Sequence, residues 1–130
     1  MERLSGYAPQ AQALLRIMSA LAFMEHGLMK QFHFPAAQPG APETLPPMLI
    51  AAAWLEIVGG GLLALGFQTR VVAFILSGMM AVAYFVVHFP QGFWPALNGG
   101  EGALLYCFIF LFLACAGPGA WSVDGMRKKA

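Results

Sequence analysis

The sequence predicts an all-α protein, an antiparallel bundle of four transmembrane helices that forms a single domain over residues 1–130. The chain is 59% hydrophobic and only 10% charged, whereas an average soluble domain carries about a quarter charged residues. Four apolar segments, separated by Gly, Pro and charged residues, each approach the ~20 residues that cross a hydrocarbon core. A soluble bundle would need a wide polar face on every helix, and the last three segments lack one. We therefore expect lipid around the helices.

The predicted spans cover residues 11–32, 48–66, 71–89 and 100–117. Five prolines after the first span exclude a helix there and predict an irregular external loop. Only residues 67–70 join the second and third spans, so these two should be antiparallel neighbours. Phe93 and Trp94, before the last span, suit the headgroup level of a membrane.

The distribution of positive charge predicts the orientation, because Lys and Arg that flank spans are retained in the cytoplasm. With four spans, only Lys30 falls on the outer side. The residues on the opposite side are Arg3, Arg70, Arg127, Lys128 and Lys129. Both termini should therefore be cytoplasmic in a multi-pass protein.

Net charge and cysteine content restrict the partners. The formal net charge is +1, which gives no basic stripe for neutralising phosphates, so no nucleic-acid partner is expected. Cys107 and Cys115 lie on one predicted helix, about 12 Å apart along its axis, and cannot pair with each other. We interpret both as small hydrophobic residues. The lipid bilayer is the expected partner.

Ionisable side chains inside the spans are the candidate site residues, because each costs ~2.5 to 3.5 kcal/mol to insert into a membrane. On the first helix, Arg16, His26 and Lys30 follow a spacing of three and four residues and should point inward together. On the third helix, Tyr84 and His88 follow the same spacing.

The other two helices each contribute a carboxyl group. Glu56 lies one turn from Gly59 and Gly60, whose missing side chains allow a helix or a ligand to come close. Glu101 begins the fourth helix. By helical rise, Glu56 should lie near the midplane, about 15 Å below the outer surface, and Lys30 should lie near that surface.

These residues favour a pocket in the outer half of the bundle that holds the head of a quinone or a similar flat apolar molecule. His26 and His88 would form hydrogen bonds with the ligand carbonyls, and Glu56 would carry protons, so these three are the candidate catalytic residues. The candidate ligand-binding residues are Arg16, Lys30, Tyr84 and Glu101.

Two other interpretations of the same residues remain open. In the first, they form an internal network, with Glu56 bound to Arg16 or His26, and Glu101 bound to Lys30 or His88. In the second, two His and two Glu hold zinc or non-haem iron. The sequence contains no HxxH, HExxH or CxxC spacing, so no metal ligands are assigned.

The order of short motifs along the chain resembles the DoxX family of small four-helix membrane proteins. The similarity covers nearly the whole length. The matching pieces are Arg16, His26-Gly27-x-x-Lys30, Leu55-Glu56-x-x-Gly59-Gly60, Gly66-x-x-Thr69-Arg70, His88, Gly99-Gly100-Glu101 and Gly117-Pro118-Gly119-x-Trp121-Ser122-x-Asp124. Glu25 falls outside this pattern.

The resemblance implies membrane-bound redox work in bacteria, as a subunit of thiosulfate:quinone oxidoreductase or as a scaffold for an oxidoreductase complex. We therefore expect an inner-membrane subunit of a redox or respiratory assembly, with quinone as the candidate cofactor. Other membrane or redox subunits, or further copies of the chain, would be its partners. The alternatives are a scaffold or assembly factor without enzymatic activity, and a carrier for a small metabolite.

Overall fold

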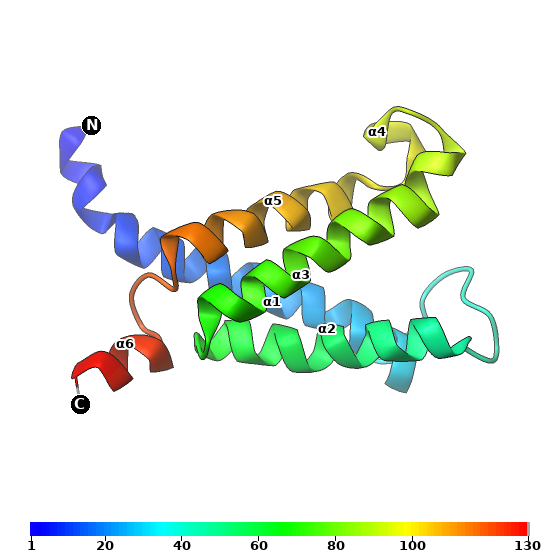
Figure 1. Cartoon of the computed structure of the whole chain (residues 1–130), viewed down its shortest axis with the longest axis horizontal. Coiled ribbons are helices and arrows are strands. Elements are labelled where there is room, and N and C mark those ends of the chain that lie inside the picture. Colours follow the sequence, from blue (N-terminus) through cyan, green and yellow to red (C-terminus); the bar gives the residue numbers. More distant parts are fainter. Residues whose placement is uncertain (130) are drawn as a thin grey trace. The chain divides into compact units, whose positions relative to one another are not determined.

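The computed structural model describes residues 1–129, and every regular element within them is helical. The all-α prediction is confirmed. In chain order (Figure 1) the elements are η1 (Glu2–Tyr7), α1 (Ala8–Phe32), α2 (Pro47–Leu65), α3 (Thr69–Ala83), η2 (Tyr84–His88), η3 (Phe89–Gln91), α4 (Pro95–Asn98), α5 (Glu101–Ala116) and α6 (Val123–Lys129).

The described chain divides into two compact units. Unit 1 contains residues 1–68 and 118–129, and unit 2 contains residues 69–117. Within unit 1, α1 packs against α2, and within unit 2, α3 packs against α5. Each unit is therefore an antiparallel helical hairpin, which Figure 1 shows for α1 with α2 and for α3 with α5.

Small residues bring α1 and α2 together in unit 1. A Cβ atom at Gly27 would lie only 2.6 Å from the carbonyl oxygen of Ala53, and one at Gly60 would lie 2.8 Å from Cβ of Met24. Close backbone approach at small residues is the usual way in which membrane helices pack. The buried face of α1 consists of Ala13, Arg16, Ser19, Ala20, Phe23 and Gly27.

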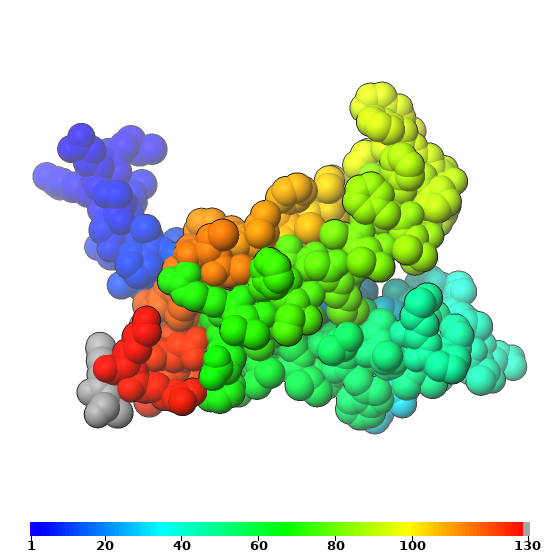
Figure 2. Space-filling view, viewed as in Figure 1, coloured from blue at the N-terminus to red at the C-terminus, as the bar shows by residue number. Residues whose placement is uncertain are grey.

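In unit 2, apolar packing and side-chain hydrogen bonds join α3 to α5. Arg70 donates hydrogen bonds to the carbonyl oxygens of Ala114 and Cys115. Ser77 on α3 donates from Oγ to the carbonyl oxygen of Cys107 on α5, at 2.7 Å. Large apolar side chains such as Phe74 and Phe85 are exposed, and Figure 2 shows the outer surface of α3 in green. An exposed apolar surface of this kind is unfavourable in water and is suited to lipid.

The four predicted segments match the helices to within three residues at every end when α3 is followed through η2 and η3 to Gln91. Pro47–Leu65 and the continuous helix Thr69–Gln91 are long and apolar enough to cross a membrane, with mean hydropathies of 2.0 and 2.1. Glu101–Ala116 is apolar but shorter, and α1 carries Arg16, Glu25 and Lys30. A bundle of four transmembrane helices therefore stays a prediction.

Five short elements were not predicted from the sequence, namely η1, η2, η3, α4 and α6. Residues Tyr84–His88 form a π-helical turn at the end of α3. The connection after it contains the short helix α4, and α6 follows the last apolar helix. Tyr84–His88 was predicted as part of the third span, without its π-helical geometry. Around α4 and α6, prolines and glycines indicated loops, but a short helix fits between such residues.

Candidate functional site

An ion pair joins the two helices of unit 1. Nζ of Lys30 lies 2.5 Å from Oε1 of Glu56, and the side chains are 15% and 4% exposed. Lys30 takes the place of Arg16 and His26, which were the expected partners of Glu56. The reason is geometric: Gly27 packs on Cβ of Glu56, and helical side chains lean toward the N-terminus, so Lys30 reaches back to the carboxylate. A pair between Lys30 and Glu101, which belong to different units, stays a prediction.

Lys30 and Glu56 lie closer together along the hairpin than the expected depths implied, and their depth in a membrane stays a prediction. Gly27 lies level with Glu56, and α1 ends five residues after Gly27, at Phe32. The helix α2 begins nine residues before Glu56, at Pro47. The start of α2 therefore extends ~6 Å beyond the end of α1, given 1.5 Å of rise per residue. The depths predicted from the sequence required the end of α1 and the start of α2 to lie at the same level, and in this hairpin they do not.

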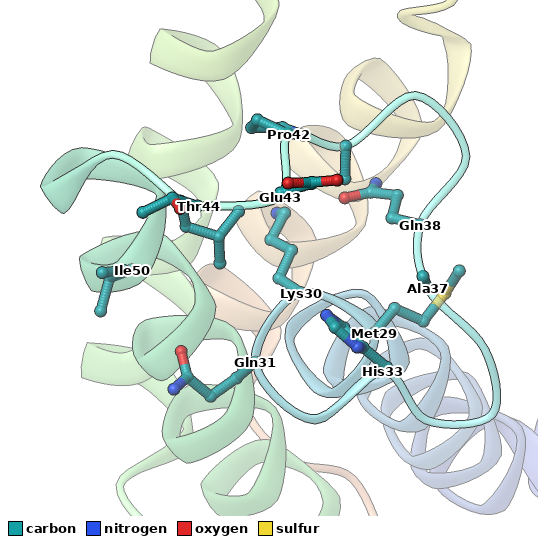
Figure 3. A pocket seen from close by; sticks show the side chains of 12 residues that line it. Met29, Lys30, Gln31, His33, Ala37, Gln38, Pro42, Glu43, Thr44 and Ile50 are labelled. Atoms are coloured by element: carbon teal, nitrogen blue, oxygen red, sulfur yellow. The ribbon is translucent and has the colours of Figure 1, made fainter.

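A hollow lies where α1 ends short of α2. It measures about 450 Å³ and lies between the end of α1, the loop 33–46 and the first turn of α2. Figure 3 shows Lys30 projecting from α1 toward the part of this loop that carries Glu43. Met29, Leu45 and Ile50 provide apolar surface. The volume is within the range of small-molecule sites, which combine apolar walls with a few polar groups.

One oxygen of Glu56 has no partner among residues 1–129. Oε2 is buried and accepts no hydrogen bond there, whereas Oε1 faces Lys30. A buried polar atom without a partner costs about 1 to 3 kcal/mol. A carboxyl oxygen in this position can hold a proton or accept a hydrogen bond from a ligand.

His26 does not share the buried face of α1. Arg16, Phe23 and Gly27 are buried, but His26 and its neighbour Glu25 are exposed. His26 therefore does not lie on the buried face of α1, because the period of 3.6 residues carries that face through Gly27 instead. The expectation that His26 points into a four-helix bundle stays a prediction. A role for His26 in a ligand site stays a prediction.

Arg16 holds the C-terminal segment of unit 1. Its side chain is fully buried and donates hydrogen bonds to the carbonyl oxygens of Pro118, Ala120 and Trp121. Fourteen residues of helix, about 21 Å, separate Arg16 from Lys30. The structure thus gives Arg16 a role in the fold at the opposite end of the hairpin, and its ligand-binding role stays a prediction.

Backbone hydrogen bonds complete this attachment. The amide of Ala120 donates to Pro9 at 3.0 Å, and the amide of Asp124 donates to Gly66 at 2.9 Å. The amide of Gln68 donates to Oδ1 of Asp124 at 2.8 Å. The start of α1 and the segment 118–124 therefore lie at the same end of unit 1. This arrangement agrees with termini on one side of a membrane, although the side itself stays a prediction.

Asn98 organises the loop end of unit 2. It is only 3% exposed, and Nδ2 donates to Tyr84 Oη at 3.2 Å and to the carbonyl of Gly92 at 2.9 Å. Oδ1 accepts the amide hydrogen of Gly100 at 2.8 Å. Nδ1 of His88 lies 3.4 Å from the backbone oxygen of Asn98. The sequence analysis did not identify Asn98, although an Asn before two glycines is typical of a structured turn.

Gly100 allows the start of α5 to contact the Tyr84 and His88 rings closely. A Cβ atom at Gly100 would lie 2.7 Å from Cβ of His88 and 2.7 Å from a ring carbon of Tyr84. Glu101, the next residue, is exposed. Within residues 1–129 it forms no ion pair, so the expected pair with His88 was wrong. His88 faces Asn98 instead.

The predicted site residues thus belong to two groups, described separately. Lys30 and Glu56 meet in unit 1, and Tyr84 and His88 share the Asn98 cluster in unit 2. A single cavity that contains His26, Glu56 and His88 stays a prediction. In the part of the chain that the structure describes, no group of three or more His, Cys, Asp or Glu could hold a metal ion.

Comparison with known proteins identifies the family. The DoxX family model matches residues 11–89. An uncharacterized protein of Haemophilus influenzae is 45% identical, over 95% of this chain and 96% of that protein. The inner membrane protein YqjF of Escherichia coli is 29% identical (88% and 89%), and the uncharacterized membrane protein Rv3486 of Mycobacterium tuberculosis is 28% identical (97% and 86%). No solved structure matches the chain significantly. The family model covers more than half of the sequence, and the chain belongs to the DoxX family of membrane proteins.

Proposed function

We propose that this protein is an integral membrane subunit of a redox or respiratory assembly, and that it binds the head of a quinone-like ligand in the hollow of unit 1. The observation that carries the proposal is the largely buried Lys30–Glu56 ion pair between α1 and α2, in which Lys30 also lines that hollow. In a membrane protein, ionisable residues away from the surface are expensive and usually serve a function.

Lys30 would bind the ligand. An ammonium group has three N–H donors, and one of these is directed at Oε1 of Glu56. The others are available to a carbonyl oxygen of a ligand in the hollow, which Lys30 lines. Met29, Leu45 and Ile50 would contact the apolar part of the ligand head.

Glu56 would exchange protons with the ligand. Its unpartnered Oε2 supports this role, because a carboxyl group that is not fully hydrogen-bonded can take up and release a proton at low structural cost. A positioned acid or base contributes typically 10²-fold to 10⁴-fold to a reaction that moves protons. Reduction of a quinone to a hydroquinone consumes two protons, so such a group would be useful next to the ligand head.

The proposal includes the predicted topology and the remaining site residues. Four spans with cytoplasmic termini would place Lys30 and the loop 33–46 on the outer side of a bacterial inner membrane. His88, Tyr84, His26, Arg16 and Glu101 are assigned only secondary roles.

A scaffold without enzymatic activity is the second candidate, and one observation favours it. Several residues of the motifs that resemble the DoxX family hold the fold together and do not line the hollow. Arg16 binds three carbonyl oxygens, and Asp124 binds the turn at Gly66 and Gln68. A small hairpin protein with such an attached C-terminal segment could present a fixed surface to another membrane protein.

Quinone titration of the purified full-length protein in lipid nanodiscs tests the proposal. Short-chain ubiquinone and menaquinone analogues are titrated while binding is measured by equilibrium dialysis. We expect saturable binding by the wild type and loss of binding in Lys30→Met. The double variant Lys30→Met/Glu56→Gln removes both charges and separates loss of binding from loss of folding. The control is Lys128→Met, which removes an exposed charge from α6. Absence of saturable binding by the wild type would contradict the proposal and favour the scaffold.

A further inference from the structure

The loop end of unit 2 contains the buried side-chain amide of Asn98, which donates two hydrogen bonds and accepts one. Its neighbours are two of the candidate site residues, Tyr84 and His88. We infer that Asn98 is a positioning residue that sets which ring nitrogen of His88 carries the hydrogen atom. This leaves Nε2 of His88 as the acceptor for a hydroxyl group of a ligand. The choice of a quinone-like ligand rests on the proposed function, whereas the tautomer of His88 is argued within unit 2 alone.

The side chain of Asn98 fixes its own backbone carbonyl. Nδ2 donates two hydrogen bonds, to the carbonyl oxygen of Gly92 at 2.9 Å and to Tyr84 Oη at 3.2 Å, and these hold one side of the Asn98 side chain. The bond from the amide of Gly100 to Oδ1, at 2.8 Å, holds the other side. The backbone oxygen of Asn98, the last residue of α4, is thereby presented to Nδ1 of His88 at 3.4 Å.

A carbonyl oxygen accepts hydrogen bonds and cannot donate them, so Nδ1 of His88 must be the donor. In a neutral imidazole the other nitrogen then has no hydrogen and acts as an acceptor. An imidazole in water favours hydrogen on Nε2, which is the opposite arrangement. Asn98 therefore selects the less common tautomer, and it does so through the position of a backbone atom.

Tyr84 is oriented by the same amide. Its hydroxyl oxygen accepts a hydrogen bond from Nδ2 of Asn98, so its own hydrogen points elsewhere and is available as a donor. The centroids of the Tyr84 and His88 rings are 6.4 Å apart, on the π-helical turn η2. Turns of this kind occur frequently at functional sites.

The two side chains together offer one donor, the Tyr84 hydroxyl, and one acceptor, Nε2 of His88. The matching ligand is a planar molecule whose hydroxyl group donates to Nε2, such as a hydroquinone. If the proton is transferred, the ligand O–H bond breaks, an N–H bond forms on Nε2, and an oxyanion faces an imidazolium. No electron transfer is part of this step.

Nitrogen NMR of the histidine rings tests the inference without any ligand. The full-length chain, labelled with ¹⁵N-histidine, is studied in detergent micelles, and the His88 signals are assigned with His88→Gln. At a pH where the ring is neutral, we expect hydrogen on Nδ1 in the wild type. A wild-type His88 with hydrogen mainly on Nε2 would overturn the inference, whatever the behaviour of the variants.

Two variants test the role of the Asn98 side chain. Asn98→Asp keeps the size and the acceptor for Gly100 but removes the donors to Tyr84 and Gly92, and Asn98→Ser serves if the Asp variant does not fold. Each should shift His88 toward the Nε2–H tautomer and weaken hydroquinone binding about tenfold, the scale of one hydrogen bond. Retention of the Nδ1–H tautomer in a folded variant would show that Asn98 does not position the ring.

The control is Gln91→Ala. Gln91 also lies at the loop end of unit 2 and donates from its amide to the carbonyl of Val87 at 2.9 Å, but it does not contact His88 in this way. Its loss should leave the His88 tautomer unchanged. Because the tautomer is measured without ligand, failure of any quinone or hydroquinone to bind would contradict the proposed function alone.

Discussion

The ammonium group of Lys30 and the carboxylate of Glu56 lie 2.5 Å apart, on neighbouring helices, with both side chains largely shielded from solvent. Removal of one member of such a pair leaves an uncompensated buried charge, which costs more than loss of both members together. Lys30 and Glu56 are therefore expected to contribute to stability as a pair, because each compensates the charge of the other.

The first prediction concerns the coupling of this pair. We expect Lys30→Met to lower the free energy of unfolding by about 3 kcal/mol, because Glu56 loses its ion-pair partner. The double variant Lys30→Met/Glu56→Gln should recover much of this loss. Thermal and denaturant unfolding in one detergent, combined as a double-mutant cycle, measures the coupling. Additive effects of the two changes would contradict a buried pair.

The second prediction concerns Arg16. Its guanidinium group binds carbonyl oxygens of Pro118, Ala120 and Trp121, and the single ammonium of a lysine cannot reproduce this geometry. Arg16→Lys should lower the free energy of unfolding by about 2 kcal/mol or more, since buried carbonyls lose their donors. Limited proteolysis should then cleave within residues 118–124.

The control for Arg16 is Arg3→Lys, because Arg3 is exposed in η1 and keeps its charge in this variant. It should match the wild type in both unfolding and proteolysis. An Arg16→Lys protein that resists cleavage as well as the wild type would exclude the anchoring role.

The third prediction compares two glycines in the first turn of α5. A Cβ atom at Gly100 would overlap with the Tyr84 and His88 side chains at 2.7 Å, whereas one at Gly102 would meet nothing within 4 Å. Gly100→Ala should destabilise the protein by about 1 to 3 kcal/mol. Gly102→Ala should be neutral or stabilise it by up to ~1 kcal/mol. Equal unfolding temperatures for the two variants would contradict the packing at Gly100.

The fourth prediction concerns orientation. Five positively charged residues fall on one predicted side and Lys30 on the other, so a reporter fused after Lys129 should be active only in the cytoplasm. The same reporter inserted between Gly40 and Ala41, in the loop 33–46, should be active only outside it. Periplasmic activity of the C-terminal fusion would reverse every depth assigned to the site residues.

Local features of the sequence predicted the long helices, but not which residues meet across them. Prolines, glycines and charges mark where the helices end, so their bounds were accessible. The Lys30–Glu56 pair depends on the offset of ~6 Å between the ends of α1 and α2, which follows from the packing of Gly27 on Glu56. Periodicity also placed His26 on the buried face of α1. That face passes through Gly27 instead, and a glycine has no side chain by which the sequence could indicate it.

The Asn98 cluster was inaccessible for a different reason. Its hydrogen bonds join a π-helical turn to a one-turn helix across ten and fourteen residues, and neither element has a periodic signal. The same holds for Asp124, whose contacts with Gly66 and Gln68 span more than fifty residues. The spacing of residues in a sequence predicts which of them are neighbours within one helix. It does not predict contacts between residues of different elements, so these became visible only in the structure.

The last prediction separates a structural from a catalytic role of Glu56. Glu56→Gln keeps the size of the side chain and an oxygen that can accept a hydrogen bond from Lys30, but it cannot release a proton. If Glu56 serves only the ion pair, the variant should bind ligand as the wild type does, and turnover should be unchanged. If Glu56 exchanges protons with a bound quinone, turnover of the purified assembly should fall by ~100-fold or more while folding and binding persist. Quinone reduction by the assembly is measured beside thermal unfolding of the isolated subunit, with Glu25→Gln as the exposed control on α1. A stable Gln variant with normal turnover would exclude the proton-exchange role, and a Gln variant that does not fold would assign Glu56 to the structure of the hairpin.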